Sequence, residues 1–307
     1  MRRHFLTSLL AMSLPALAQP VPAPALPRPS HGRLERLPTI ASRHVDARPV
    51  DVWLPDDYDA RVARGERFAV LYLHDGQMQF DAATTWNHQA WAIDRAVTRL
   101  VAEGQMPPVI LVAVWNNGRW RHSEYLPQKF LPHLPEDVRT RLVAEALHGQ
   151  PQSDAYLRFL VEELKPLIDT RYATHTGPAH TAVMGSSMGG LISVYALCEY
   201  PQVFGAAAGL STHWIGIFQP NEDLPAAGRA YLREHLPDPA THRLYQDHGT
   251  TELDALYPPY QPPVDALVRA RGYTDAHYLS RVFPGTGHNE TAWAERVHIP
   301  LSFLFRR

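Results

Sequence analysis

A serine between two glycines is the strongest chemical signal in this sequence. Residues 185–189 read Gly-Ser-Ser-Met-Gly, with an apolar strand-like run before them and an apolar helix-like run after them. In a sharp strand-to-helix turn of the form Gly-x-Ser-x-Gly, the serine hydroxyl stands exposed at the start of the helix, and small neighbours leave room for the turn. The motif selects Ser187, because a motif centred on Ser186 would require glycine at Met184. The pattern therefore predicts a covalent nucleophile at Ser187.

A serine hydroxyl needs a base, and in this kind of turn the partners follow along the chain in the order serine, acid, histidine. His288 lies in a Gly-Thr-Gly-His-Asn-Glu loop directly after the last apolar strand-like run. A loop at the carboxyl edge of a parallel sheet is where such a base is needed. His298 falls in the predicted terminal helix and fits poorly. The other histidines, interpreted as solvent-facing or hydrogen-bonding residues, include His74, His122, His180 and His248.

Two further roles follow from the chemistry of acyl transfer. The oxyanion needs two backbone N–H donors, one from the residue after the nucleophile and one from a loop after an early strand. Met188 and Gln77 are the predicted donors. The acid is expected after the strand at 243–246, where the residues alone leave Glu252, Asp254 and the more distant Asp265 open. Asp247 lies so near the strand end that a structural role is favoured for it. No histidine or cysteine cluster has the spacing of a zinc site, and no cofactor is predicted.

The elements that must position these residues alternate between apolar runs and amphipathic stretches, which is typical of an α/β fold with a mostly parallel sheet and helices on both faces. Strands are predicted near 49–54, 68–73, 108–115, 180–184, 204–209, 243–246 and 278–283. The clearest predicted helix covers 154–169, with Ser153 as a possible N-cap. We expect one α/β domain over residues 36–307. Cys198 is the only cysteine, so no internal disulfide can form.

The N-terminal residues have the composition of an export signal. Residues 1–18 hold two arginines, then an apolar run, then Ala-Leu-Ala, which predicts a signal peptide. Arg2-Arg3 is also compatible with the twin-arginine route, so export by either that route or Sec is expected. The proline-rich residues 19–35 are predicted to be a tether. These features indicate a periplasmic or extracellular protein.

Charge and length limit the classes of partner. The 307 residues are 45% hydrophobic and 20% charged, with a formal net charge of −2. Such a balance gives no reason to expect nucleic acid or an anionic membrane surface as partner. No apolar run reaches the roughly 20 residues needed to span a bilayer, so stable membrane insertion is not expected. A small-molecule ester fits better, and the sequence leaves the oligomeric state open.

The chain resembles the esterase D branch of the α/β-hydrolases, which includes S-formylglutathione hydrolases, enterobactin esterases, feruloyl and acetylxylan esterases, and mycolyltransferases. Four segments carry the resemblance: residues 71–77 with Phe80-Asp81, residues 112–116 with 121–125, residues 185–190, and residues 285–290 with Trp293. The resemblance implies an oxyanion hole from Met188 and Gln77. It also implies an acid three residues past the loop glycine, which selects Glu252. Asp254 is the next candidate, because one more loop residue could reach the same place, and Asp265 follows. Some enterobactin esterases work with a serine–histidine pair alone.

The predicted activity is hydrolysis of carboxylic esters through an acyl-enzyme on Ser187. One departure from the resemblance is His74, where relatives often have an apolar residue. An envelope ester, such as a siderophore lactone or an acylated sugar, is the expected substrate. The alternatives are an acyltransferase or peptidase on the same residues, and a catalytically silent binding protein on this scaffold.

Overall fold

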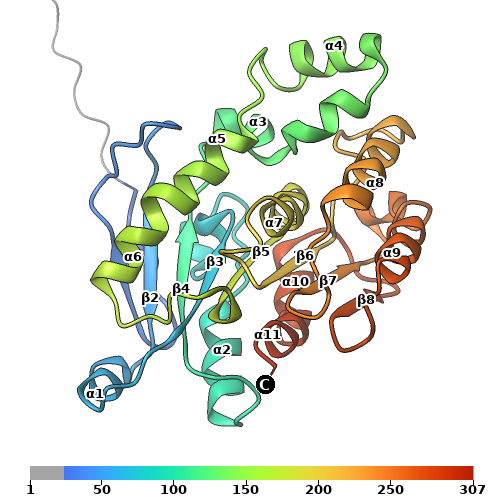
Figure 1. Ribbon diagram of the computed structural model, residues 1–307. Helices are drawn as coiled ribbons and strands as arrows, with labels where there is room; N and C mark the ends of the chain where they lie inside the picture. Colours follow the sequence, from blue (N-terminus) through green and yellow to red (C-terminus); the bar gives the residue numbers. More distant parts are fainter. Residues whose placement is uncertain (1–23, 307) are drawn as a thin grey trace, which may run out of the picture.

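The computed structural model describes residues 24–306. Its centre is an eight-stranded sheet in the order β1-β2-β4-β3-β5-β6-β7-β8 (Figure 1). The strands are β1 Arg33–Arg36, β2 Val50–Leu54, β3 Ala69–Leu73, β4 Val109–Val114, β5 Thr181–Ser186, β6 Ala206–Leu210, β7 Arg243–His248 and β8 Tyr278–Val282.

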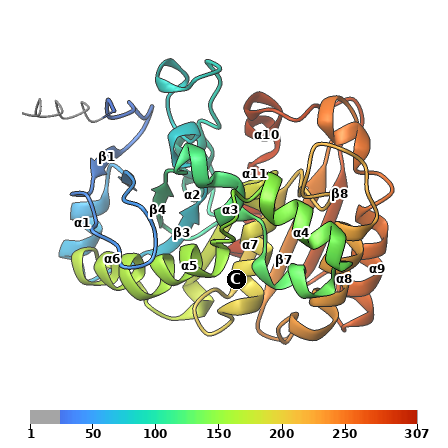
Figure 2. The ribbon, with the colours of Figure 1, turned by 90° about the horizontal axis from the view of Figure 1, so that it is seen from above.

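Six of these strands run parallel. β1 and β2 pair antiparallel, as do β2 and β4, whereas β4, β3, β5, β6, β7 and β8 are parallel neighbours. The central strands are buried along their whole length, as expected for parallel strands covered on both faces. Seen from above in Figure 2, the blue N-terminal strands lie at one end of the sheet and the orange and red C-terminal elements at the other. This confirms the predicted α/β-hydrolase fold, and it brings the carboxyl ends of β3, β5, β6 and β7 to one edge.

Helices cover both faces of the sheet. The α-helices are α1 Tyr58–Ala63, α2 Ile93–Ala102, α3 Arg121–Tyr125, α4 Glu136–Glu145, α5 Ser153–Arg158, α6 Lys165–Arg171, α7 Met188–Glu199, α8 Asp223–His235, α9 Gln261–Ala270, α10 Glu290–Arg296 and α11 His298–Leu304. Short 3₁₀ helices are η1 Gly76–Met78, η2 Ala82–Thr84, η3 Gly118–Trp120, η4 Gln128–His133, η6 Pro178–His180 and η7 Glu252–Leu256. The core of one face includes apolar residues of α5 to α9, and that of the other includes α2, α10 and α11.

The predicted helix at 154–169 is present with an irregular middle. α5 and α6 are joined by one π-helical segment, η5 Phe159–Leu164, and together they form one continuous rod. Pro166 follows the π segment and has no N–H for an intrahelical bond, which accounts for a local change of hydrogen-bonding pattern there. Ser153 is the first helical residue and Gln152 occupies the cap position.

The domain begins earlier than predicted. Residues 33–35 are predicted to be tether but lie in β1, which pairs with β2, and the backbone N–H groups of Ser30 and His31 both donate to Asp94. Three of the four β1 residues are charged, so their side chains gave no apolar signal for an edge strand. The predicted signal peptide lies outside the described residues. Within residues 24–306, no helix is long and apolar enough to cross a membrane.

Candidate active site

The predicted nucleophile lies in a strained turn between β5 and α7. Ser187 has φ 56° and ψ −124°, a backbone conformation that non-glycine residues rarely adopt. A Cβ atom on Gly185 would lie 2.7 Å from the backbone of Gly189, so the turn requires glycine at that position. The Ser187 N–H donates to the carbonyl of Leu210 on β6 at 2.8 Å, which fixes the turn to the next strand. The strain is typical of a functional position.

Four of the residues predicted from the sequence line one cleft. Ser187, His288, Gln77 and Met188 all border a hollow of about 300 Å³ at the carboxyl edge of the sheet. They come from the turns and loops that follow β5, β8 and β3.

Asp254 is the carboxylate that contacts the histidine. Its Oδ1 lies 2.6 Å from Nδ1 of His288. Its Oδ2 accepts the Ser211 hydroxyl at 2.6 Å and the Gly249 N–H at 2.5 Å. Asp254 is fully buried, whereas the imidazole is partly open to the cleft. A carboxylate accepts only, so in the neutral imidazole the proton lies on Nδ1 and the lone pair on Nε2.

Glu252 does not reach the imidazole, and the expectation that it does is wrong. Its carboxylate accepts the backbone N–H of His288 at 2.7 Å and the side-chain amide of Asn289. Glu252 opens η7 with φ +55°, and from there its side chain meets the backbone of the histidine loop. A Cβ on Gly287 would collide with this carboxylate at 2.6 Å, so the contact needs glycine there. Asp265 accepts the Tyr278 hydroxyl at 2.5 Å and is not in contact with the histidine.

Two aromatic rings flank the His288 imidazole. Tyr257 and Trp293 lie edge-on to it, with ring centroids 5.9 and 5.0 Å away. The Tyr257 hydroxyl lies 2.6 Å from Nδ1 of His213, and the Trp293 indole N–H donates to Ser211 at 2.9 Å. Burial, followed by the proximity of His288, lowers the pKa of His213 to about 3, so His213 is neutral.

The two predicted oxyanion donors have free N–H groups. Among the described residues, neither the backbone N–H of Met188 nor the backbone N–H of Gln77 has a hydrogen-bond acceptor. Gln77 lies in η1, which begins at Gly76. A Cβ on Gly76 would lie 2.5 Å from the Ala113 carbonyl carbon, so only glycine lets this loop approach β4. Both backbone N–H groups are therefore left without an acceptor within the described residues.

A partly buried ion pair supports the loop that carries Gln77. The Asp75 carboxylate accepts two hydrogen bonds from Arg121 at 2.8 Å and one from the Asn116 amide at 2.7 Å. Burial by itself would raise the pKa of Asp75, but Arg121 and Asn116 hold it below its usual value. His74, next in sequence, is buried and lies 2.8 Å from the Tyr156 hydroxyl. His74 is thus part of the support behind the loop rather than of the cleft wall.

Backbone strain recurs at the strand ends around this cleft. Asp75, Ser187, Ser211 and Glu252 have positive φ values and follow β3, β5, β6 and β7, respectively. Non-glycine residues in this region cost free energy and persist where surrounding contacts fix them. Sequence reasoning identified Ser187 and weighed Glu252, but it missed Ser211 because a lone serine carries no motif.

The mouth of the cleft carries exposed aromatic surface. Trp86 and Phe218 are 82% and 74% exposed, and both line the cleft. Glu290 also lines it, and its carboxylate accepts the side-chain amide of Asn87 at 2.7 Å. A planar or apolar part of a ligand could stack on these rings.

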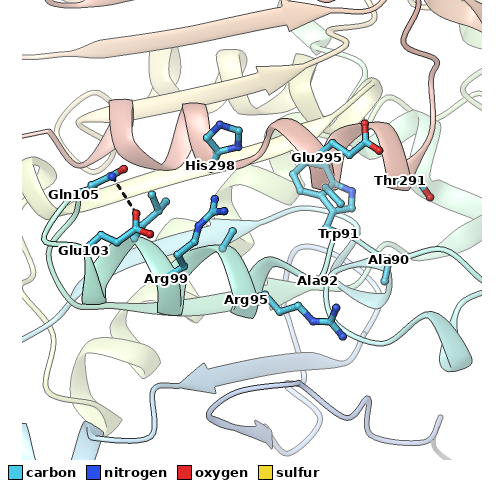
Figure 3. A pocket seen from close by; sticks show the side chains of 13 residues that line it. Ala90, Trp91, Ala92, Arg95, Arg99, Glu103, Gln105, Thr291, Glu295 and His298 are labelled. Carbon is cyan, nitrogen blue, oxygen red and sulfur yellow. Dashed lines mark hydrogen bonds between the residues drawn. The ribbon is translucent and has the colours of Figure 1, made fainter.

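A larger hollow of about 710 Å³ lies elsewhere, between α2 and the α10–α11 region (Figure 3). Arg95, Arg99, Glu103 and Glu295 line it. Within residues 24–306 its lining includes one histidine, His298, and no serine, so it offers no Ser–His arrangement for acyl transfer. In the part of the chain that the structure describes, no group of three or more His, Cys, Asp and Glu side chains could hold a metal ion.

Comparison with known proteins identifies the family. The sequence profile of the putative esterase family matches residues 43–298, which is most of the chain. The chain belongs to the putative esterase family. This esterase-family chain is 25% identical over 280 residues to an endo-1,4-beta-xylanase/feruloyl esterase of Xylanibacter ruminicola, covering 90% of the chain and 32% of that relative. The chain therefore spans about a third of that relative's length.

Solved structures share the fold of this esterase-family chain. A ferulic acid esterase matches with a TM-score of 0.63 and 19% identity, covering 90% of this chain and 99% of that one. The enterochelin esterase of Shigella flexneri matches with a TM-score of 0.64 and 17% identity, covering 91% of this chain and 60% of that one. An IroE-like serine hydrolase from Shewanella oneidensis matches with a TM-score of 0.63 and 18% identity, covering 89% of this chain and 80% of that one. At these identities the likeness shows the fold alone.

Proposed function

We propose that this protein is a serine esterase that hydrolyses carboxylic esters through an acyl-enzyme. The observation that carries the proposal is the 2.6 Å contact of the His288 imidazole with buried Asp254, on a loop that borders the same cleft as strained Ser187. Membership of the putative esterase family supports the reaction type.

The proposed reaction begins with attack of Ser187 Oγ on the ester carbonyl. Nε2 of His288 takes the hydroxyl proton, and the ionised Asp254 stabilises the imidazolium that forms. The amides of Met188 and Gln77 receive the oxyanion of the tetrahedral intermediate. His288 then returns the proton to the departing alcohol, and an activated water releases the acid from Ser187 in the second half of the cycle.

The mouth of the cleft favours an ester with an aromatic or other planar group. Trp86 and Phe218 offer exposed rings beside Ser187, and aromatic pairs prefer offset or edge-to-face contact. A feruloyl esterase and an enterobactin esterase are among the similar proteins, and a feruloyl ester carries an aromatic ring. We further propose that the protein acts in the periplasm or outside the cell, which is supported by the signal-like composition of residues 1–18.

The experiment is a hydrolysis profile of the wild type and the Ser187→Ala variant. The panel holds p-nitrophenyl esters from acetyl to long chain, feruloyl esters and a cyclic triserine siderophore, each with and without an added alcohol acceptor. We expect hydrolysis that Ser187→Ala loses by several orders of magnitude. Transfer product in place of free acid would indicate an acyltransferase, and an inactive wild type would contradict the proposal.

A further inference from the structure

Ser211, at the end of β6, has no role in the reaction described above, and its surroundings are unusual. It is fully buried and has φ +46°, a conformation in which glycine would be free of strain. A non-glycine residue in this position is held there by its contacts.

The direction of the Ser211 hydrogen bonds is fixed by its partners. Its oxygen lies 2.9 Å from the Trp293 indole nitrogen and 2.9 Å from Nη2 of Arg296. Indole and guanidinium nitrogens only donate, so both bonds fill the acceptor sites of the hydroxyl. Its single proton then points to the remaining partner, Oδ2 of Asp254, at 2.6 Å.

The backbone of Ser211 is held by the same network. Its N–H donates to Oδ1 of Asp247 at 3.1 Å, and Asp247 is paired with Arg296 at 3.1 and 3.2 Å. Both charged residues are buried, and the Tyr245 hydroxyl donates to Asp247 as well. The ion pair therefore fixes Ser211 from its N–H and from its hydroxyl at once.

We propose that Ser211 is a positioning residue. Its hydroxyl holds Oδ2 of Asp254 so that Oδ1 meets the His288 imidazole. Ser211 thereby couples the buried Asp247–Arg296 pair to the catalytic site. This inference rests on the proposed function. Ser211 touches neither the cleft nor the reacting atoms, so it acts through Asp254. Loss of its hydroxyl leaves the Gly249 N–H as the other donor to Oδ2.

The test compares Ser211→Gly with Ser211→Ala. Both remove the hydroxyl, but glycine fits φ +46° and alanine keeps the backbone strain, so the glycine variant is expected to unfold at the higher temperature. A hydrogen bond to a charged group has the strength to change a rate by about 10- to 100-fold. We expect kcat to fall by about that factor in both variants, with KM changed less than about twofold, because substrate does not contact Ser211.

Ser153→Ala is the matched control. Ser153 is also fully buried, and its hydroxyl accepts the Gln128 N–H at 2.7 Å. Neither residue belongs to the loops that carry Ser187, Asp254 and His288. This variant is expected to lose stability and keep the wild-type kcat. A Ser211→Gly variant with wild-type kcat, or a kcat that follows the unfolding temperature across the three variants, would overturn the positioning role.

The failure of the proposed function gives a different result. In that case the wild type hydrolyses no ester of the panel, or Ser187→Ala keeps its ester hydrolysis, whatever the Ser211 variants do. If Ser187→Ala is inactive and Ser211→Gly is fully active, the serine mechanism stands and only the role of Ser211 is lost.

Discussion

Replacing Asp254 by asparagine is expected to abolish most of the activity, for a reason that its three hydrogen bonds make explicit. Oδ2 faces two donors, the Ser211 hydroxyl and the Gly249 N–H, while Oδ1 faces Nδ1 of His288. Asparagine has one carbonyl oxygen and one NH₂ group in place of the two carboxylate oxygens. The oxygen must take the Oδ2 position, because an NH₂ group there would meet two donors in a buried site.

The NH₂ group of the introduced asparagine then faces Nδ1 of His288. Nδ1 must accept that hydrogen bond, so the ring proton moves to Nε2, the nitrogen that should take the proton of Ser187. An equivalent change in a serine protease lowers kcat by about 10⁴, which corresponds to about 5.4 kcal/mol of transition-state stabilisation. We expect a fall of about this size in Asp254→Asn, with little change in KM because Asp254 does not line the cleft.

Glu252→Gln is the matched comparison. The introduced glutamine keeps an acceptor for the His288 backbone N–H, and the native Glu252 makes no contact with the ring. The kcat of this variant is expected to stay within about tenfold of the wild type, since one hydrogen bond to a charged group is weakened. Steady-state kinetics on one p-nitrophenyl ester at about pH 7 to 8 measures both variants. The reasoning is refuted if Asp254→Asn stays within about tenfold of the wild type while Glu252→Gln falls about a hundredfold or more.

Three further predictions concern the surroundings of the site. Gly76→Ala is expected to lower kcat by about 10²- to 10³-fold, because its Cβ would push the loop carrying a predicted oxyanion donor away from β4, and unchanged steady-state kcat would contradict this. Since Arg121 holds the pKa of Asp75 below its unfolded value, this pair stabilises the fold above about pH 4 and the stabilisation is lost as pH falls through the lowered folded pKa. In urea unfolding, the difference in free energy of unfolding between the wild type and Arg121→Met should therefore narrow below about pH 4. A difference that widens below about pH 4 would contradict a lowered pKa of Asp75. Trp86→Ala and Phe218→Ala are expected to raise KM for feruloyl esters more than for acetyl esters with kcat kept, and equal effects on both substrates would exclude a stacking role.

The parts of this structure that sequence could predict are those fixed by local spacing. The strand-to-helix turn at Ser187 requires small residues at defined positions, so it was predicted close to its observed place. The parallel strands are apolar runs, so they were predicted close to their observed places as well. β8 was also predicted as an apolar run, so the His288 loop was expected directly after it. β1 was missed because three of its four residues are charged, and pairing with β2 rather than apolar content defines it.

The carboxylate that contacts His288 could not be predicted from local spacing. Glu252 and Asp254 are two residues apart in one 3₁₀ turn, and which carboxylate faces the ring depends on the left-handed φ of Glu252 and on the space that Gly287 leaves. The network through Ser211 was also beyond prediction. It joins the end of β6, the loop after β7 and helix α10, and no sequence pattern records that these three meet.

The central claim, a covalent serine mechanism on this chain, is tested most directly by mapping an active-site label. Wild-type protein is treated with a fluorophosphonate probe, digested, and analysed by mass spectrometry beside Ser187→Ala. The account predicts one probe per chain on Ser187, in the peptide that holds residues 185–190, and neither label nor ester hydrolysis in the variant. A label on Ser186, or ester hydrolysis that persists in Ser187→Ala, would contradict it.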